Sequence, residues 1–233
     1  MLYPVTIDSV LVMRNNPAGF RLAGFVEALV YRLAGMQEHI ENKNSLPLSL
    51  EAEADDVRQS KNGDGQAYRR LVESHQKYVG QLMWRFSRDS QVHEELVQDV
   101  FVEAFLSLAG FSEKAPFGHW LSKIATRVGY RYWKQTARRH SIETFSVQEW
   151  DEIVDEKVER MDASKAASLI YKLLAQLPPR DRLVLTLRYL EQCSVAETVR
   201  RTSWSKIMVK VQTWRALRKL EKLLSQAEQE MTQ

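Results

Sequence analysis

Five basic side chains recur at helical spacing near the middle of the chain. Their intervals of four, four, three and four residues would place them on one face of a helix. Like charges at this spacing repel one another, and no acidic residue occurs between Leu121 and His140 to relieve them. A polyanion outside the chain is therefore the natural counterpart of this face. The five residues are Lys123, Arg127, Arg131, Lys134 and Arg138.

Aromatic residues are interleaved with these charges, namely Trp120, Tyr130, Tyr132 and Trp133. Aromatic rings beside basic groups suit stacking on unpaired nucleic-acid bases. The alternative is that the apolar side of the helix packs into a protein core, and this is the better interpretation for Trp120 and Ile124. For the basic face itself, binding of a polyanion is the better interpretation.

A row of acidic residues forms a second candidate surface, on the helix expected before the basic one. Glu95, Asp99 and Glu103 follow one another at four-residue intervals, opposite an apolar stripe that runs from Leu96 to Leu108. Taken alone, such a row is usually a solvated helix face. The residues themselves therefore do not decide between solvent and a protein partner.

The C-terminal part of the chain contains start and stop signals for several short helices. Pro178 and Pro179 end one helix and begin another, because proline is favoured in a first helical turn. Ser194 with Glu197 matches a capping box, which would open a short helix that ends near Thr202. A short helix in this position predicts the first half of a helix-turn-helix.

The turn at residues 203–204 leads into a longer basic helix, for which Ser205 is a suitable cap. From Arg200 to Lys222 only Glu221 opposes the basic residues. This pattern is typical of a recognition helix, where Lys and Arg read guanine or phosphates and Gln reads adenine. Besides Ser205, the candidate DNA-binding residues are Lys206, Lys210, Gln212, Trp214, Arg215, Arg218 and Lys219.

The composition restricts the classes of protein that fit. Glycine and proline are scarce, at 9 and 6 of 233 residues, which favours helices over sheets. The single cysteine, Cys193, excludes an internal disulfide, and the five histidines lack ligand spacing, so we expect no cofactor and no metal. The sequence contains no phosphate-binding loop and no nucleophile motif, so we do not expect an enzyme. No apolar stretch approaches the length of a membrane span, so a cytoplasmic protein is expected.

We expect an all-α chain with two small helical domains joined by an acidic linker. Residues 1–62 form an N-terminal extension of unknown role, within which Met36 is an alternative start. Residues 63–140 form the first domain, residues 141–162 the linker and residues 163–227 the second domain.

The two helical blocks resemble the extracytoplasmic-function group of sigma-70-type sigma factors. Residues 94–101 (EELVQDVF) look like region 2.2 of that family, and residues 120–125 (WLSKIA) look like regions 2.3 to 2.4. Residues 177–182 (LPPRDR) resemble region 4.1, and residues 209–220, which end in WRALRKL, resemble the recognition helix of region 4.2. The order of these motifs, separated by an acidic segment, is more specific than any one of them.

The resemblance implies a non-catalytic protein that directs core RNA polymerase to promoter DNA. An anti-sigma factor is a further candidate partner, and the sequence does not decide whether one binds. The first domain of the chain would contact polymerase through Glu95, Gln98, Asp99 and Glu103. The same domain would bind the minus-10 element, with the loop at residues 111–119 helping to capture an extruded base. The minus-10 residues would be Trp120, Lys123, Arg127, Arg131, Lys134 and Arg138, and the recognition-helix residues named above would read the minus-35 element.

A stand-alone helix-turn-helix regulator is the alternative function. It would explain the C-terminal block but would leave the acidic row and the basic, aromatic helix without a purpose. Binding to a duplex operator in the absence of polymerase would favour it over a sigma factor.

Overall fold

The computed structural model describes residues 50–142 and 170–231, and within these ranges every regular element is helical. The first helical unit, residues 50–142, contains α3 (Leu50–Lys61), α4 (Gly65–Met83), α5 (Ser90–Ser107), a 3-10 turn (Leu108–Gly110) and α6 (Phe117–Ile142). The second helical unit, residues 170–231, begins with a helical stretch at residues 170–175. It continues with α8 (Pro179–Leu185), a π-helical segment (Thr186–Leu190), α9 (Val195–Thr202) and α10 (Lys206–Met231). The expected all-α fold is confirmed.

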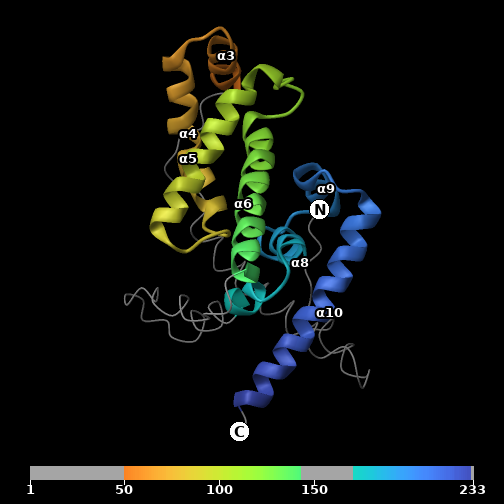
Figure 1. Cartoon of the computed structure of the whole chain (residues 1–233). Helices are drawn as coiled ribbons and strands as arrows, with labels where there is room; N and C mark the ends of the chain where they lie inside the picture. The colour runs from red at the N-terminus through yellow and green to blue at the C-terminus, as the bar shows by residue number, and fades with distance from the viewer. Residues whose placement is uncertain (1–49, 143–169, 232–233) are drawn as a thin grey trace, which may run out of the picture.

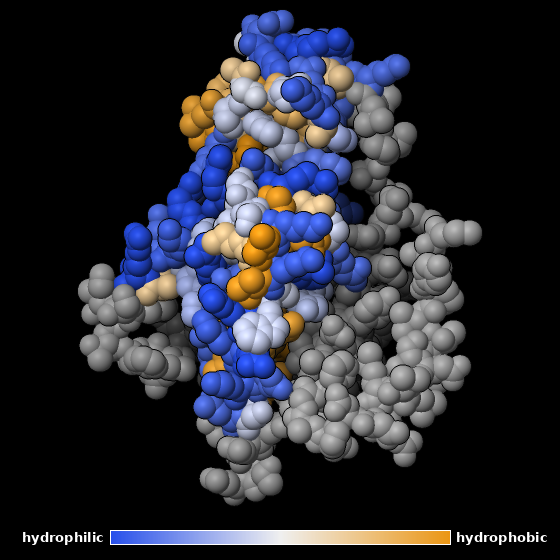
Figure 2. Space-filling model, turned by 90° about the vertical axis from the view of Figure 1, so that its right-hand side faces the viewer, coloured by the Kyte–Doolittle hydropathy of each residue, from blue (hydrophilic) through white to orange (hydrophobic). Residues whose placement is uncertain are grey.

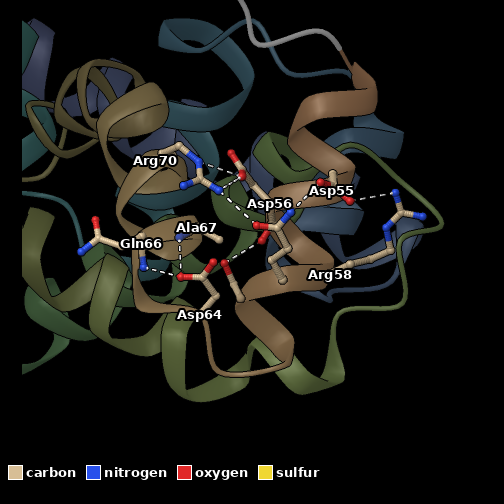
Figure 3. Close-up of polar contacts among 9 residues, drawn as sticks. Asp55, Asp56, Arg58, Asp64, Gln66, Ala67 and Arg70 are labelled. Atoms are coloured by element: carbon tan, nitrogen blue, oxygen red, sulfur yellow. Dashed lines mark hydrogen bonds and ion pairs between the residues drawn. The ribbon is translucent and has the colours of Figure 1, made fainter.

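The turn between α3 and α4 is held by short-range polar contacts (Figure 3). Asp64 caps α4 because its carboxylate accepts hydrogen bonds from the backbone N–H groups of Gln66 and Ala67, at 2.8 and 3.2 Å. Arg70 of α4 reaches back to α3 and donates two hydrogen bonds to one carboxylate oxygen of the buried Asp56. These contacts fix the angle between α3 and α4.

The first helical unit therefore begins earlier than the expected boundary at residue 63. Val57 of α3 is buried in the same core cluster as α4, α5 and α6, and α3 packs along α4. The glycines at positions 63 and 65 flank a tight turn inside the bundle and do not separate two domains. The expected helix at residues 17–40 and most of the acidic linker lie outside the described residues.

Close packing of α6 against the segment after α4 depends on Gly129. A Cβ atom at this position would lie 2.3 Å from two ring carbons of Phe86, well inside van der Waals contact. The Phe86 ring fills this space and also contacts Trp133, at a centroid distance of 4.5 Å. The indole N–H of Trp133 donates to the carbonyl oxygen of Phe86 at 2.8 Å, so the buried donor is satisfied.

We expect Gly129→Ala to lower the free energy of unfolding by about 1–3 kcal/mol, because the added methyl must displace Phe86. Urea unfolding followed by circular dichroism measures the change. Gly118→Ala in the same helix is the matched control, since its Cβ would meet only ordinary contacts with His75 at 3.7 Å. Equal stability of the two variants would contradict the role assigned to Gly129.

The second helical unit contains the expected helix-turn-helix. Ser194 caps α9 and Ser205 caps α10, each accepting a hydrogen bond of 3.1 Å from a backbone N–H three residues later. Only half of the expected capping box forms, because the Glu197 carboxylate binds Arg201. Ser203 makes the turn in the left-handed conformation, with φ of 60°.

The two units pack directly on each other. α8 and α9 lie against α6, and α10 runs on the side of them away from α5 (Figure 1). Leu183, Leu187 and Cys193 of the second unit belong to the same buried cluster as the core of the first. In the parts of the chain described, no helix is both long and apolar enough to span a bilayer.

Candidate nucleic-acid interface

The basic face predicted on α6 is present and open to solvent. Lys123, Arg127, Arg131, Lys134 and Arg138 are all exposed along one side of the helix. The helix that carries them is continuous from Phe117 to Ile142, so their spacing is preserved. DNA binding by these residues stays a prediction.

The charge balance of this face differs from the expectation, because its counterions come from the neighbouring helix. Glu103 of α5 accepts hydrogen bonds from Arg127, at 2.8 and 3.1 Å, and from Arg131. Asp99 lies 3.8 Å from Arg131. Arg127 and Arg131 are thus paired within the protein, and an external polyanion is not their only possible counterpart.

Glu103 is consequently a contact between α5 and α6. Burial opposes its ionisation, but the hydrogen bonds and charges of Arg131 and Arg127 outweigh burial and lower its pKa below the ordinary value of 4.5. Among the predicted polymerase contacts Glu103 is the least exposed, whereas Glu95, Gln98 and Asp99 are all exposed to solvent.

We expect Glu103→Gln to lower the free energy of unfolding at pH 7 by up to about 1 kcal/mol, because the ion pairs are partly exposed. A lowered folded-state pKa stabilises the fold above pH 4.5 and stops doing so as the pH falls through the lowered value. The difference from wild type should therefore shrink in acid, as measured by urea unfolding at several pH values. Glu94→Gln, at an exposed position of the same helix, is the control. A pH-independent difference would contradict this assignment.

The aromatic residues of α6 are mostly packed against other protein groups. Trp120 is half-buried against Phe111 and Phe117, and Ile124 is buried, as expected for core positions. Trp133 is buried, and Tyr130 lies 6.4 Å from Trp204 of the second unit, measured between ring centroids. The rings predicted to stack on bases are therefore largely covered in this conformation.

The loop before α6 borders a shallow cleft of about 270 Å³. One wall is the loop from Phe111 to Phe117, and the other comes from α3, through Glu53, Ala54 and Val57. Lys61 holds the loop in place by donating to the carbonyl oxygen of Phe111 at 2.7 Å and to Glu113 at 2.5 Å. The sequence did not indicate that α3 contributes to this site.

Three apolar side chains missed by the sequence analysis lie exposed near the C-terminal end of α5. Val102, Phe105 and Leu106 are 56%, 53% and 77% exposed. Helical geometry puts Val102 and Leu106 on the same face as Glu95 and Asp99. Apolar residues occur on all sides of this part of the helix, so periodicity alone could not separate core from surface. Exposed apolar patches are typical of surfaces that contact a partner.

The predicted DNA-binding residues of α10 fall into two groups, one exposed to solvent and one in contact with α8. Ser205, Lys206, Lys210, Trp214, Arg215 and Arg218 are exposed, with the Arg218 guanidinium 4.3 Å from the Trp214 ring centroid. Gln212 and Lys219 instead bind the buried carboxylate of Asp181 in α8, the ammonium group of Lys219 at 2.6 Å. These two side chains hold α10 to α8.

Two further apolar residues, Ile207 and Val211, lie on the outer side of α10. They are 76% and 41% exposed, and helical spacing places them between Lys206 and Lys210 on one flank and Arg215 on the other. Figure 2, which looks onto the side where α10 lies, shows apolar side chains surrounded by hydrophilic ones. The sequence analysis followed the basic residues and overlooked this apolar stripe.

Comparison with known families agrees with this arrangement of helices. Residues 71–139 match the family described as Sigma-70 region 2, and residues 167–220 match Sigma-70, region 4. The chain belongs to the sigma-70 family of sigma factors. Within that family it is a member of the extracytoplasmic-function (ECF) group, as its curated relatives indicate.

The curated relatives share about a quarter of their aligned residues with this chain. The chain is 24% identical to the ECF RNA polymerase sigma factor SigW of Bacillus subtilis over 149 residues, which covers 60% of this chain and 80% of SigW. It is 26% identical to the ECF RNA polymerase sigma-E factor of Haemophilus influenzae over 146 residues, 59% of this chain and 77% of the relative. A solved structure of CnrH in complex with the cytosolic domain of CnrY shares 23% identity and a TM-score of 0.48, covering 75% of this chain and 97% of CnrH.

Proposed function

We propose that this sigma factor directs core RNA polymerase to promoters through three surfaces, on α5, α6 and α10. The observation that best supports this proposal is the exposure of these three helices. Each of them packs into the protein core on one side and still exposes charged or apolar side chains on another. The protein's role is binding and positioning, and it requires no covalent chemistry.

The proposed polymerase contact is the outer face of α5. Its N-terminal half presents Glu95, Gln98 and Asp99, and its C-terminal half presents Val102 and Leu106. A polar half followed by an apolar half resembles a protein interface with a desolvated centre and a charged rim. Glu103 would act indirectly, by holding α5 to α6.

We expect Leu106→Ser to weaken binding to core polymerase by about tenfold, because it removes an apolar contact that becomes buried. Fluorescence anisotropy of the labelled chain titrated with core enzyme measures the affinity. Ser107→Ala, at an exposed position on a different side of the same helix, is the control. Unchanged affinity in the Leu106 variant would exclude this face.

The proposed minus-10 surface is the basic side of α6 together with the cleft beside it. Lys123, Lys134 and Arg138 would contact the DNA backbone, and Arg127 and Arg131 would exchange part of their pairing with Glu103 for phosphate. The cleft between the loop at residues 111–117 and α3 is large enough in volume to receive a base, and aromatic Phe111 and Phe117 line it. Trp120 would support this cleft from behind.

The proposed minus-35 surface is the exposed side of α10. Lys206, Lys210 and Arg215 flank the apolar stripe, so they are suited to phosphates and guanine edges on either side of it. Ile207 and Val211 are suited to thymine methyl groups in the major groove. Trp214 and Arg218 lie one and two turns further along the same side.

Run-off transcription with sigma-free core polymerase and promoter fragments tests the function. The wild-type chain should give discrete start sites, and replacing both Lys210 and Arg215 with Ala should reduce the transcripts by about tenfold or more. Lys222→Ala, at an exposed position of α10 beyond the family match, should leave them unchanged. Duplex binding without any polymerase-dependent transcript would instead indicate a stand-alone regulator.

A further inference from the structure

Two side chains of α3 tie down the loop that precedes α6, one at each end of the loop. At its start, the ammonium group of Lys61 donates to the backbone carbonyl oxygen of Phe111 at 2.7 Å and to the Glu113 carboxylate at 2.5 Å. At its end, the Glu53 carboxylate accepts a hydrogen bond of 3.2 Å from the backbone N–H of Phe117, the first residue of α6. α3 and the loop are the two walls of the cleft described above and lie side by side (Figure 1), so these contacts join one wall to the other.

The two side chains of α3 are themselves held in place. The Glu53 carboxylate lies 3.3 Å from the imidazole of His75 in α4, measured between Oε2 and Nε2. The ring of His75 contacts the ring of Phe117 edge-on, at a centroid distance of 5.2 Å. The side chain of Lys61 is only 22% exposed. Its ammonium group is therefore occupied by the loop and is poorly placed to meet a DNA phosphate.

The loop contains a backbone conformation that needs support from its surroundings. Glu113 has φ of 58°, in the left-handed region that a residue with a Cβ atom rarely adopts. Such conformations persist only where surrounding contacts hold them, and they concentrate at binding sites. Lys61 provides the contact here, through the Glu113 carboxylate and through the carbonyl oxygen of Phe111. The shape of the loop thus depends on a residue of α3 that is distant in the sequence.

A loop fixed in this way is suited to receive an unpaired base. A loose loop would lose conformational freedom each time it bound, which lowers affinity, whereas a loop already ordered by the fold does not. Phe111 and Phe117, which line the cleft, are the residues that α3 holds at the two ends of the loop. The contacts from α3 therefore set the width of the cleft and the positions of both rings.

We propose that Lys61 and Glu53 of α3 are positioning residues for capture of the extruded minus-10 base, and that they act through the loop and not by contact with DNA. This inference rests on the proposed function and adds α3 to the parts that the minus-10 site needs. α3 precedes residue 71, where the match to Sigma-70 region 2 begins, so both residues lie outside the segment that identifies the family. Without their contacts the loop loses its fixed distance from α3, and the cleft no longer holds a base.

Binding of the holoenzyme to a promoter fork with a single-stranded minus-10 segment tests the proposal. The promoter is one found by run-off, and 2-aminopurine placed at each non-template position in turn identifies the extruded base by its rise in fluorescence. An abasic site then replaces that base. The wild-type holoenzyme should bind the abasic fork about tenfold more weakly than the intact fork, because the captured base and its stacking are lost.

Three variants loosen the loop in different ways. Glu113→Ala removes the partner of the lysine while keeping a Cβ atom at the left-handed position, and Lys61→Met removes both contacts at the start of the loop. In each variant the penalty for the abasic site should fall from about tenfold to about twofold, because the loosened loop no longer holds the base. Glu53→Ala should do the same from the other end. Glu51→Ala is the matched control, since it makes the same change of charge at an exposed position of α3 and should keep the full penalty.

The sign of the Glu113→Ala effect separates positioning from a direct contact between Lys61 and DNA. Removing the carboxylate adds positive charge and frees the lysine, so a phosphate contact would raise the affinity for intact and abasic forks alike. Positioning instead lowers the affinity for the intact fork and leaves the abasic fork nearly unchanged. A merely structural effect would weaken binding to both forks and would lower the midpoint of urea unfolding.

The inference is overturned if the penalty for the abasic site is the same in wild type and in the three variants, or if Glu113→Ala changes the affinity for both forks equally. It is also overturned if the wild-type holoenzyme transcribes while no minus-10 position gains 2-aminopurine fluorescence. Failure of the proposed function has a different signature, because wild type would then give no run-off transcripts from any promoter fragment.

Discussion

Trp133 is the side chain on which both halves of the molecule depend. Its indole N–H is satisfied by the carbonyl oxygen of Phe86, and its ring packs against Phe86 within the first unit. Arg182 of the second unit lies over the same ring. Because Gly129 has no side chain, Phe86 can come close enough to α6 to make this arrangement. One buried indole thus organises the core of one unit and supplies the docking point for the other.

The basic residues of the chain serve two different purposes, and their neighbours in space determine which. Lys219 and Gln212 hold the buried Asp181, and Arg127 and Arg131 share Glu103, so these four side chains connect helices. A buried carboxylate requires such partners, because an unpaired charge away from water is costly. The remaining cations on α6 and α10 stay exposed, and these are the better candidates for contacts with DNA.

The apolar residues of α5 and α10 also fall into two groups, one buried in the core and one exposed to solvent. Leu96, Val100 and Ala104 of α5 are buried, whereas Val102 and Leu106 of the same helix face solvent. On α10, Val209 and Ala216 are buried while Ile207 and Val211 are exposed. A helix that must fold against its own domain and also bind a partner carries two apolar faces, and only the packing identifies the outer one.

The sequence by itself determined the helical class, the caps at Ser194 and Ser205, and the faces of α6 and α10, because these depend on spacing and local hydrogen bonds. Motif order was enough to recognise the family. Only the tertiary structure decided that α3 belongs to the first bundle, that Glu103 pairs with two arginines and that Arg182 rests on Trp133. These contacts join residues far apart in the chain, and a one-dimensional pattern carries no information about which distant helix supplies a counterion or a ring.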